Sequence, residues 1–166
     1  MHYRLSELRN VSSDVGLPDE DPLRDEGALL EAQLLAVDLT TVDGTAALLF
    51  DLRTSISQRH GNVGVIFVHR LFAFAWDAEP RKSVQTAWNV VEWSPRVDPT
   101  VSLRASFEPS AHLAIGGDEA EFWLCEVDLP AAPPEYGPDS DRWESGFPTM
   151  ESSGSVVGMS RVIWAR

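Results

Sequence analysis

Several features that would identify a function are scarce or missing in this chain of 166 residues. It contains one lysine, Lys82, and one cysteine, Cys125, so no disulfide can form within it. The absence of internal disulfides is typical of a reducing compartment. The first ten residues lack the apolar core of a signal peptide, and no window approaches the ~20 uncharged apolar residues of a membrane span. We therefore expect a cytoplasmic protein that has no membrane partner.

The motifs of common catalytic and metal sites are missing as well. The nucleophile-elbow spacing Gly-x-Ser-x-Gly does not occur. Residues 61–64 contain two glycines but lead into an apolar segment, whereas a phosphate cradle precedes a helix. The acidic stretch 139–144 lacks the glycine and the distal glutamate of a calcium loop. No two of the four histidines share metal-ligand spacing: His2, His60, His69 and His112. We expect no metal and no cofactor, and we favour a protein that is not an enzyme.

Positive charge is also scarce, since 26 acidic side chains face 13 basic ones for a net charge of −13. An acidic surface repels the phosphate backbone and therefore argues against a nucleic-acid partner. The same field attracts a basic protein and raises its association rate. The alternative interpretation is that the charge serves solubility alone.

Segments rich in β-branched and aromatic residues dominate the rest of the chain. Apolar residues crowd 62–76 and 83–93 without a helical period. Residues 29–39 and 45–53 flank Asp43-Gly44, which favours a hairpin turn. Residues 100–107 alternate, which predicts that four apolar side chains face inward: Val101, Leu103, Ala105 and Phe107.

The remaining segments complete a single all-β domain. Gly116-Gly117-Asp118 predicts a turn between strands at 110–116 and 120–129, and 155–165 predicts a closing strand. We expect an antiparallel β-sandwich or barrel of about seven or eight strands over 1–166. Its expected parts are an N-terminal helix and acidic turn segment (1–28), a main sheet (29–129), an acidic Pro/Gly-rich loop (130–154) and a closing strand (155–166).

The loop at 130–154 is the first candidate site. Acidic side chains gather there around one tryptophan, and these residues are the candidate partner-binding set: Trp143, Asp139, Asp141, Glu144 and Glu135. An aromatic side chain among carboxylates is suited to anchor a basic protein partner. The alternative is that Trp143 folds back and caps the sheet.

Two further hypotheses concern the interior of the sheet. Apolar residues on both strand faces can line a ligand cavity in a β-barrel, with four candidate pocket residues: Phe72, Phe74, Trp88 and Trp123. A barrel-type hydrolase or isomerase would instead use His69, Glu92 or Asp51. We favour a structural role for His69 in the middle of its strand. Similarly, we favour for Glu92 an edge charge or an ion pair with a basic residue such as Arg53 or Arg70, and we expect Cys125 to be buried and inert.

The general make-up of the chain resembles that of small bacterial immunity proteins from toxin–immunity systems. The resemblance lies in the acidic, Ala- and Arg-rich, lysine-poor composition, which is similar to that of actinobacterial proteins. It extends to the segments Leu48-Leu49-Phe50-Asp51-Leu52-Arg53 and Phe74-Ala75-Trp76. It implies a cytoplasmic inhibitor that binds a basic toxin domain and catalyses no reaction, and it assigns a role to no individual residue.

Overall fold

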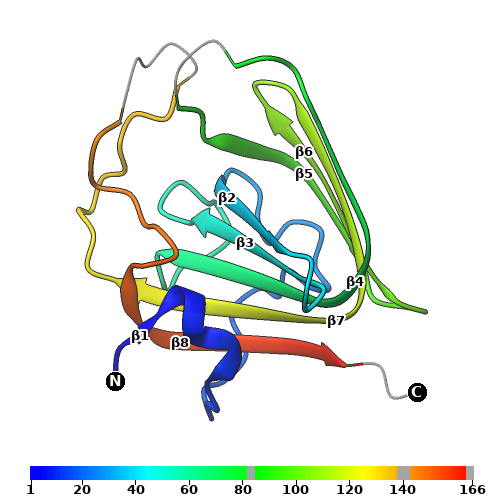
Figure 1. Ribbon diagram of the computed structural model, residues 1–166. Helices are drawn as coiled ribbons and strands as arrows, with labels where there is room; N and C mark the ends of the chain where they lie inside the picture. Colours follow the sequence, from blue (N-terminus) through cyan, green and yellow to red (C-terminus); the bar gives the residue numbers. More distant parts are fainter. Residues whose placement is uncertain (82–84, 138–142, 164–166) are drawn as a thin grey trace.

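The structure, a computed structural model, describes residues 1–81, 85–137 and 143–163, and its regular elements are antiparallel strands and one short 3-10 helix. The helix η1 spans Leu5–Asn10. The strands are β1 (Tyr3–Arg4), β2 (Gln33–Thr40), β3 (Thr45–Asp51), β4 (Val63–Ala78), β5 (Trp88–Arg96), β6 (Val101–Glu108), β7 (Ala111–Val127) and β8 (Ser153–Ile163) (Figure 1). The predicted all-β class is confirmed.

The sheet closes on itself because β7 has partners on both edges. Along one edge it pairs with β4 over almost its whole length, and along the other it pairs first with β6 and then with β8. The ring runs β7-β4-β3-β2-β5-β6 and returns to β7, while β8 and β1 branch from the second half of β7. In Figure 1, β4 and β7 curve together from the level of β8 to that of β6.

The turn predicted at Gly116-Gly117-Asp118 is wrong, because β7 runs through these residues as one strand. A Cβ atom on Gly117 would lie 2.6 Å from Val68 Cγ1 and 2.7 Å from the carbonyl oxygen of His69. The glycine is therefore needed for the close approach of β4, where the sheet branches. Glycine pairs in sequence predict turns, but they also permit such close packing inside a strand.

The strand β4 bends at the same level. Arg70 has a φ of +49°, and the register with β7 shifts between Leu71 and Ala73. The Arg70 side chain lies 3.7 Å from the Asp118 carboxylate and also contacts Glu119. These ion pairs hold the bend of β4 against the branch point of β7.

The interior of the ring is a packed hydrophobic core. Phe50 and Trp93 meet edge to face with ring centroids 5.9 Å apart, and the Trp93 indole donates to the carbonyl oxygen of Pro22 at 2.8 Å. The alternation predicted for β6 is confirmed, since its four apolar side chains are buried in this core: Val101, Leu103, Ala105 and Phe107.

A second hydrophobic cluster covers the opposite face of β3, β4 and β7. Leu5 and Leu8 of η1 pack there against Leu49 and Trp123. The predicted N-terminal helix is thus present as a 3-10 helix, and its apolar side chains explain why β3 is buried on both faces. In the described residues, the search for a helix long and apolar enough to cross a membrane finds none.

Candidate functional site

One surface groove lies on the outer face of four neighbouring strands and has a volume of about 520 Å³. Four of its polar side chains form one row across the sheet. In the strand register, Glu92 of β5 is opposite Ser106 of β6, Ser106 is opposite His112 of β7, and His112 is opposite Asp77 of β4. With strands ~4.8 Å apart, the row is ~14 Å long. We call these four residues the polar row.

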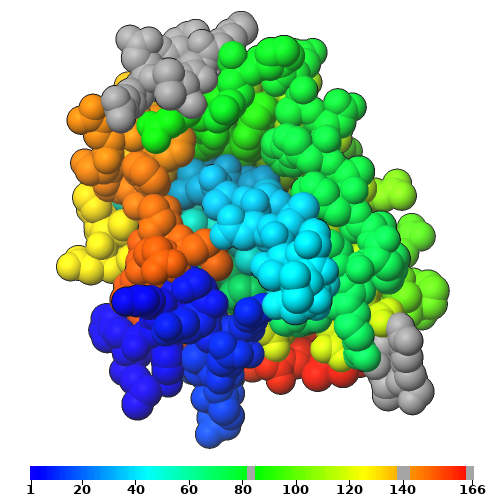
Figure 2. Space-filling view, in the orientation of Figure 1, coloured from blue at the N-terminus to red at the C-terminus, as the bar shows by residue number. Residues whose placement is uncertain are grey.

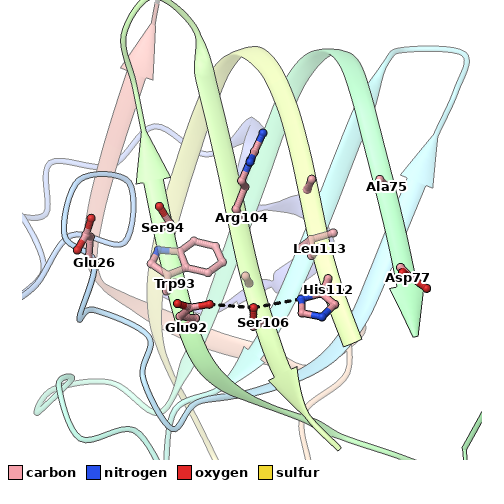
Figure 3. A pocket seen from close by; sticks show the side chains of 12 residues that line it. Glu26, Ala75, Asp77, Glu92, Trp93, Ser94, Arg104, Ser106, His112 and Leu113 are labelled. Carbon is pink, nitrogen blue, oxygen red and sulfur yellow. Dashed lines mark hydrogen bonds between the residues drawn. The ribbon is translucent and has the colours of Figure 1, made fainter. Parts of the chain in front are cut away.

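The centre of the polar row is a hydrogen-bonded chain (Figure 3). The Ser106 hydroxyl donates to Glu92 Oε2 at 3.0 Å and lies 3.2 Å from His112 Nδ1. With the hydroxyl proton directed to the carboxylate, the second bond forms with the tautomer of His112 that carries a proton on Nδ1. A serine nucleophile needs the opposite arrangement, in which its proton goes to the histidine. This geometry therefore suits a binding surface better than a nucleophilic site.

Carboxylates dominate the rim of this groove. Glu92 and Asp77 are exposed at the two ends of the polar row, and Glu26 adds a third carboxylate. Arg104, two residues before Ser106 on β6, is the arginine that lines the groove (Figure 3). Such a rim attracts a cationic group of a partner.

A second groove is apolar, and side chains of three strands form it. It has a volume of about 360 Å³ and lies between β2, the later half of β4 and the start of β5; we call it the apolar groove. Trp76 packs edge to face on Trp88, with ring centroids 5.4 Å apart, and also contacts Phe107. The apolar groove is lined by Leu34, Leu35, Ala36, Val37, Leu39, Phe74, Trp76 and Trp88.

The structure brings together only half of the predicted pocket residues. Phe74 and Trp88 line the apolar groove. Phe72 instead is exposed, because the register shift in β4 directs it outward against Gly116. Trp123 is fully buried in the second cluster on the other face of the sheet. The four residues therefore do not line one cavity, since the strand faces separate them.

The candidate loop residues are also in different environments. Trp143 is 8% exposed and packs edge to face between Tyr136 and Phe147, with centroids 5.1 and 4.5 Å away. Trp143 thus folds back onto the protein, the alternative interpretation of the sequence, and is not open to a partner. Glu135 and Glu144 are exposed. Asp139 and Asp141 lie outside the described residues.

A buried ion pair fastens this loop to the sheet. Asp51 is fully buried, and its Oδ2 lies 2.6 Å from Arg53 Nη2 and accepts a bond from the Tyr136 hydroxyl at 2.7 Å. The guanidinium also donates to the carbonyl oxygens of Pro130 and Gly146. Burial raises the pKa of Tyr136, and the Asp51 carboxylate raises it further. Asp51 therefore binds Arg53 structurally, and Arg53 is not the partner of Glu92.

His69 lies in a further cluster of charged side chains, together with Glu121 and Arg161. Its Nε2 lies 3.6 Å from Glu121 Oε2, and Arg161 Nη2 lies 2.5 Å from the other carboxylate oxygen. The Trp123 indole donates to Glu121 at 3.3 Å. Burial raises the pKa of Glu121, but the bond with His69 and the charge of Arg161 outweigh it, and the pKa is below its usual value. This environment fits the structural role predicted for His69.

The three candidate catalytic residues consequently do not share a site. Glu92 is on the polar row, Asp51 is under the loop, and His69 is paired with Glu121. Within the described residues, no group of three or more His, Cys, Asp or Glu is arranged to hold a metal ion. Burial raises the pKa of the Cys125 thiol to about 12, which fits the predicted inert thiol.

Sequence reasoning missed the polar row, and of the residues that line the apolar groove it singled out only Phe74 and Trp88. The alternation of 100–107 places Ser102, Arg104 and Ser106 on the outer face, which is half of the information needed to predict the polar row. The other half is the register of β6 with β5 and β7, and register across strands is not encoded in local periodicity.

Comparisons with known proteins add little to this description. No family model and no curated protein matches the sequence. A solved structure described as an uncharacterized protein from Neisseria gonorrhoeae is similar over 56% of this chain and 90% of its own, with 10% identity and a TM-score of 0.36. A similarity this low carries no argument about fold or function.

Proposed function

We propose that this chain is a non-enzymatic acidic protein of the bacterial cytoplasm that binds a basic protein partner, as an inhibitor or immunity protein does. The observation that carries the proposal is the surface distribution of charge. The described carboxylates are mostly exposed, whereas six of the arginines contact carboxylates of the same chain: Arg4, Arg9, Arg24, Arg53, Arg70 and Arg161. Negative charge therefore exceeds positive charge at the surface.

The arrangement of the polar groups supports binding over catalysis. Asp51 and His69 are engaged in structural pairs, and Ser106 donates to Glu92. Exposed carboxylates at the rim of a shallow groove steer a basic partner to the surface and help to hold it. An apolar groove elsewhere on the same domain offers the buried contact area that gives an interface its affinity.

The loop contributes to this function in two ways. Its exposed carboxylates, Glu135 and Glu144, add to the field that attracts the partner. Trp143 packs with Tyr136 and Phe147 and so maintains the shape of the loop. The sequence predicts that Asp139 and Asp141 belong to the same acidic set. Changing both to Asn would then weaken this field and lower the association rate.

The test is capture of partners from the source organism, followed by binding kinetics at low and high salt. We expect a partner of high isoelectric point whose association slows as salt rises. Two pairs of substitutions localise the contact: Asp77→Asn with Glu92→Gln, and Glu135→Gln with Glu144→Gln. The matched control, Glu7→Gln with Asp14→Asn, removes two exposed charges elsewhere.

At least one of the two pairs should slow association several-fold while the control pair leaves it unchanged. Capture of no basic protein, or association that salt does not affect, contradicts the proposed function.

A further inference from the structure

Two strand edges face the apolar groove without a strand partner in the described part of the chain. The strand β2 pairs with β5 only at Gln33 and Leu34, so from Leu35 onward its described partner is β3, on the other edge. Similarly, β4 pairs with β3 only up to Val68; beyond the bend the Leu71 amide donates to the Gly44 carbonyl oxygen at 2.8 Å, and the described strand partner is β7. In Figure 1, β2 and the curved later half of β4 bound the same side of the ring.

These edges carry only part of the usual protection against pairing, namely Asp38, Asp77 and the register shift in β4. Exposed edges in natural proteins commonly carry lysine or proline, but neither residue occurs in 35–40 or in 71–78. Large apolar side chains beside them stay accessible, since Leu39 is 44% exposed and Trp76 is 36% exposed. In Figure 2 the cyan β2–β3 hairpin and the green later part of β4 meet at the surface.

The charged residues on the two edges have one sign. Asp38 lies between Val37 and Leu39 on β2, and Asp77 follows Trp76 on β4; both carboxylates are exposed. Their alternation with apolar residues matches an extended segment in which apolar and basic side chains alternate. A small apolar molecule would fill the groove but would leave the backbone donors and acceptors of both edges unpaired.

We propose that the apolar groove takes an extended, basic segment of the partner by β-strand addition. Backbone hydrogen bonds to the edge of β2 or β4 supply affinity, and alternate apolar side chains enter the groove against Trp76 and Trp88. Basic side chains of the segment face Asp38 and Asp77. This inference rests on the proposed function and names the binding site for it.

The probe is a synthetic seven-residue peptide of alternating Lys and Val, with capped ends. Its two controls are a peptide of alternating Glu and Val and the basic peptide with N-methylated valines, which cannot donate from those amides. Because strand addition depends mainly on the backbone, we expect the basic peptide to bind in calorimetry. Each control peptide should bind at least tenfold more weakly.

Variants of the protein localise the site. Trp76→Ala and Leu39→Ser should weaken peptide binding at least tenfold. The matched controls are Phe72→Ala, a similarly large aromatic outside the groove on the same strand, and Val42→Ser, in the hairpin turn and 96% exposed. Melting temperatures show which variants remain folded, and Leu39→Ser stays informative if Trp76→Ala unfolds.

Several outcomes overturn the inference. One is the absence of peptide binding, and another is equal binding of the N-methylated peptide. A third is binding of an apolar dye that Trp76→Ala abolishes while the peptide does not bind, which would assign the groove to a small molecule. If a basic partner is captured equally by wild type, Trp76→Ala and Leu39→Ser, the apolar groove is not its binding site and the proposed function stands. If no basic partner is captured, the proposed function fails, whatever the peptide does.

Discussion

Asp51 and Arg53, two residues apart at the end of β3, form the most buried ion pair that the described residues contain, with 0% and 5% of their side chains exposed. The guanidinium joins the sheet to the loop through the carbonyl oxygens of Pro130 and Gly146. A buried charge that loses its partner is strongly destabilising. The stability of the loop therefore depends on this pair.

We predict that Asp51→Asn lowers the free energy of unfolding by about 3 kcal/mol, because it leaves the Arg53 charge buried without a carboxylate. Chemical denaturation of the variant measures this loss. The control, Asp38→Asn, changes an exposed carboxylate and should stay within about 0.5 kcal/mol of wild type. Equal stabilities of the two variants would show that the pair has no structural role.

We predict that Gly117→Ala destabilises the fold by about 1–3 kcal/mol. The added methyl group would collide with Val68 and the backbone of His69, and overpacking at such a site forces the strands apart. Gly16→Ala is the control, since no atom lies within 4 Å of its added Cβ. Thermal melting of both variants compares them, and a Gly117→Ala protein as stable as Gly16→Ala would contradict the close approach of β4.

Glu121 predicts a pH dependence of stability. Its pKa in the folded protein is below the ordinary value of 4.5, so the unfolded chain binds the proton more readily. The contribution of the Glu121 carboxylate to stability is complete above pH 4.5. It is lost as the pH falls through the lower pKa of Glu121 in the folded protein. Urea denaturation between pH 3 and 7 should show that wild type loses more stability on acidification than Glu121→Gln, and parallel curves would exclude the effect.

We predict that Cys125 does not react with a thiol reagent in the folded protein. Its thiol is fully buried, and a pKa of about 12 leaves almost no thiolate at neutral pH. Labelling with iodoacetamide should become complete only in denaturant, as mass spectrometry can follow. Rapid labelling of the native protein at pH 7.5 would mean that β7 opens locally or that the thiol is accessible.

Local pattern was enough to predict much of the sheet. The Asp43-Gly44 turn is present, with Gly44 at a φ of +65°, and the alternation of 100–107 gives the buried and outward faces of β6. These features depend on backbone conformations and periodicities within a few residues, which each short segment carries by itself.

Contacts between distant segments decided the rest. The pair Gly116-Gly117 predicts a turn until the approach of β4 is known. Of the segment 83–93, residues 83 and 84 lie outside the described residues, 85–87 precede the strand, and β5 begins at Trp88. Of the two interpretations of Trp143, packing against Tyr136 and Phe147 is the one observed.

The sequence by itself determined the all-β class, the acidic surface and which side chains alternate. Only the tertiary structure aligned Glu92, Ser106 and His112 in one row and opened the apolar groove between β2 and β4. The physical reason is that register and closure are set by the packing of whole strands against one another, and a single strand's periodicity does not specify its neighbour.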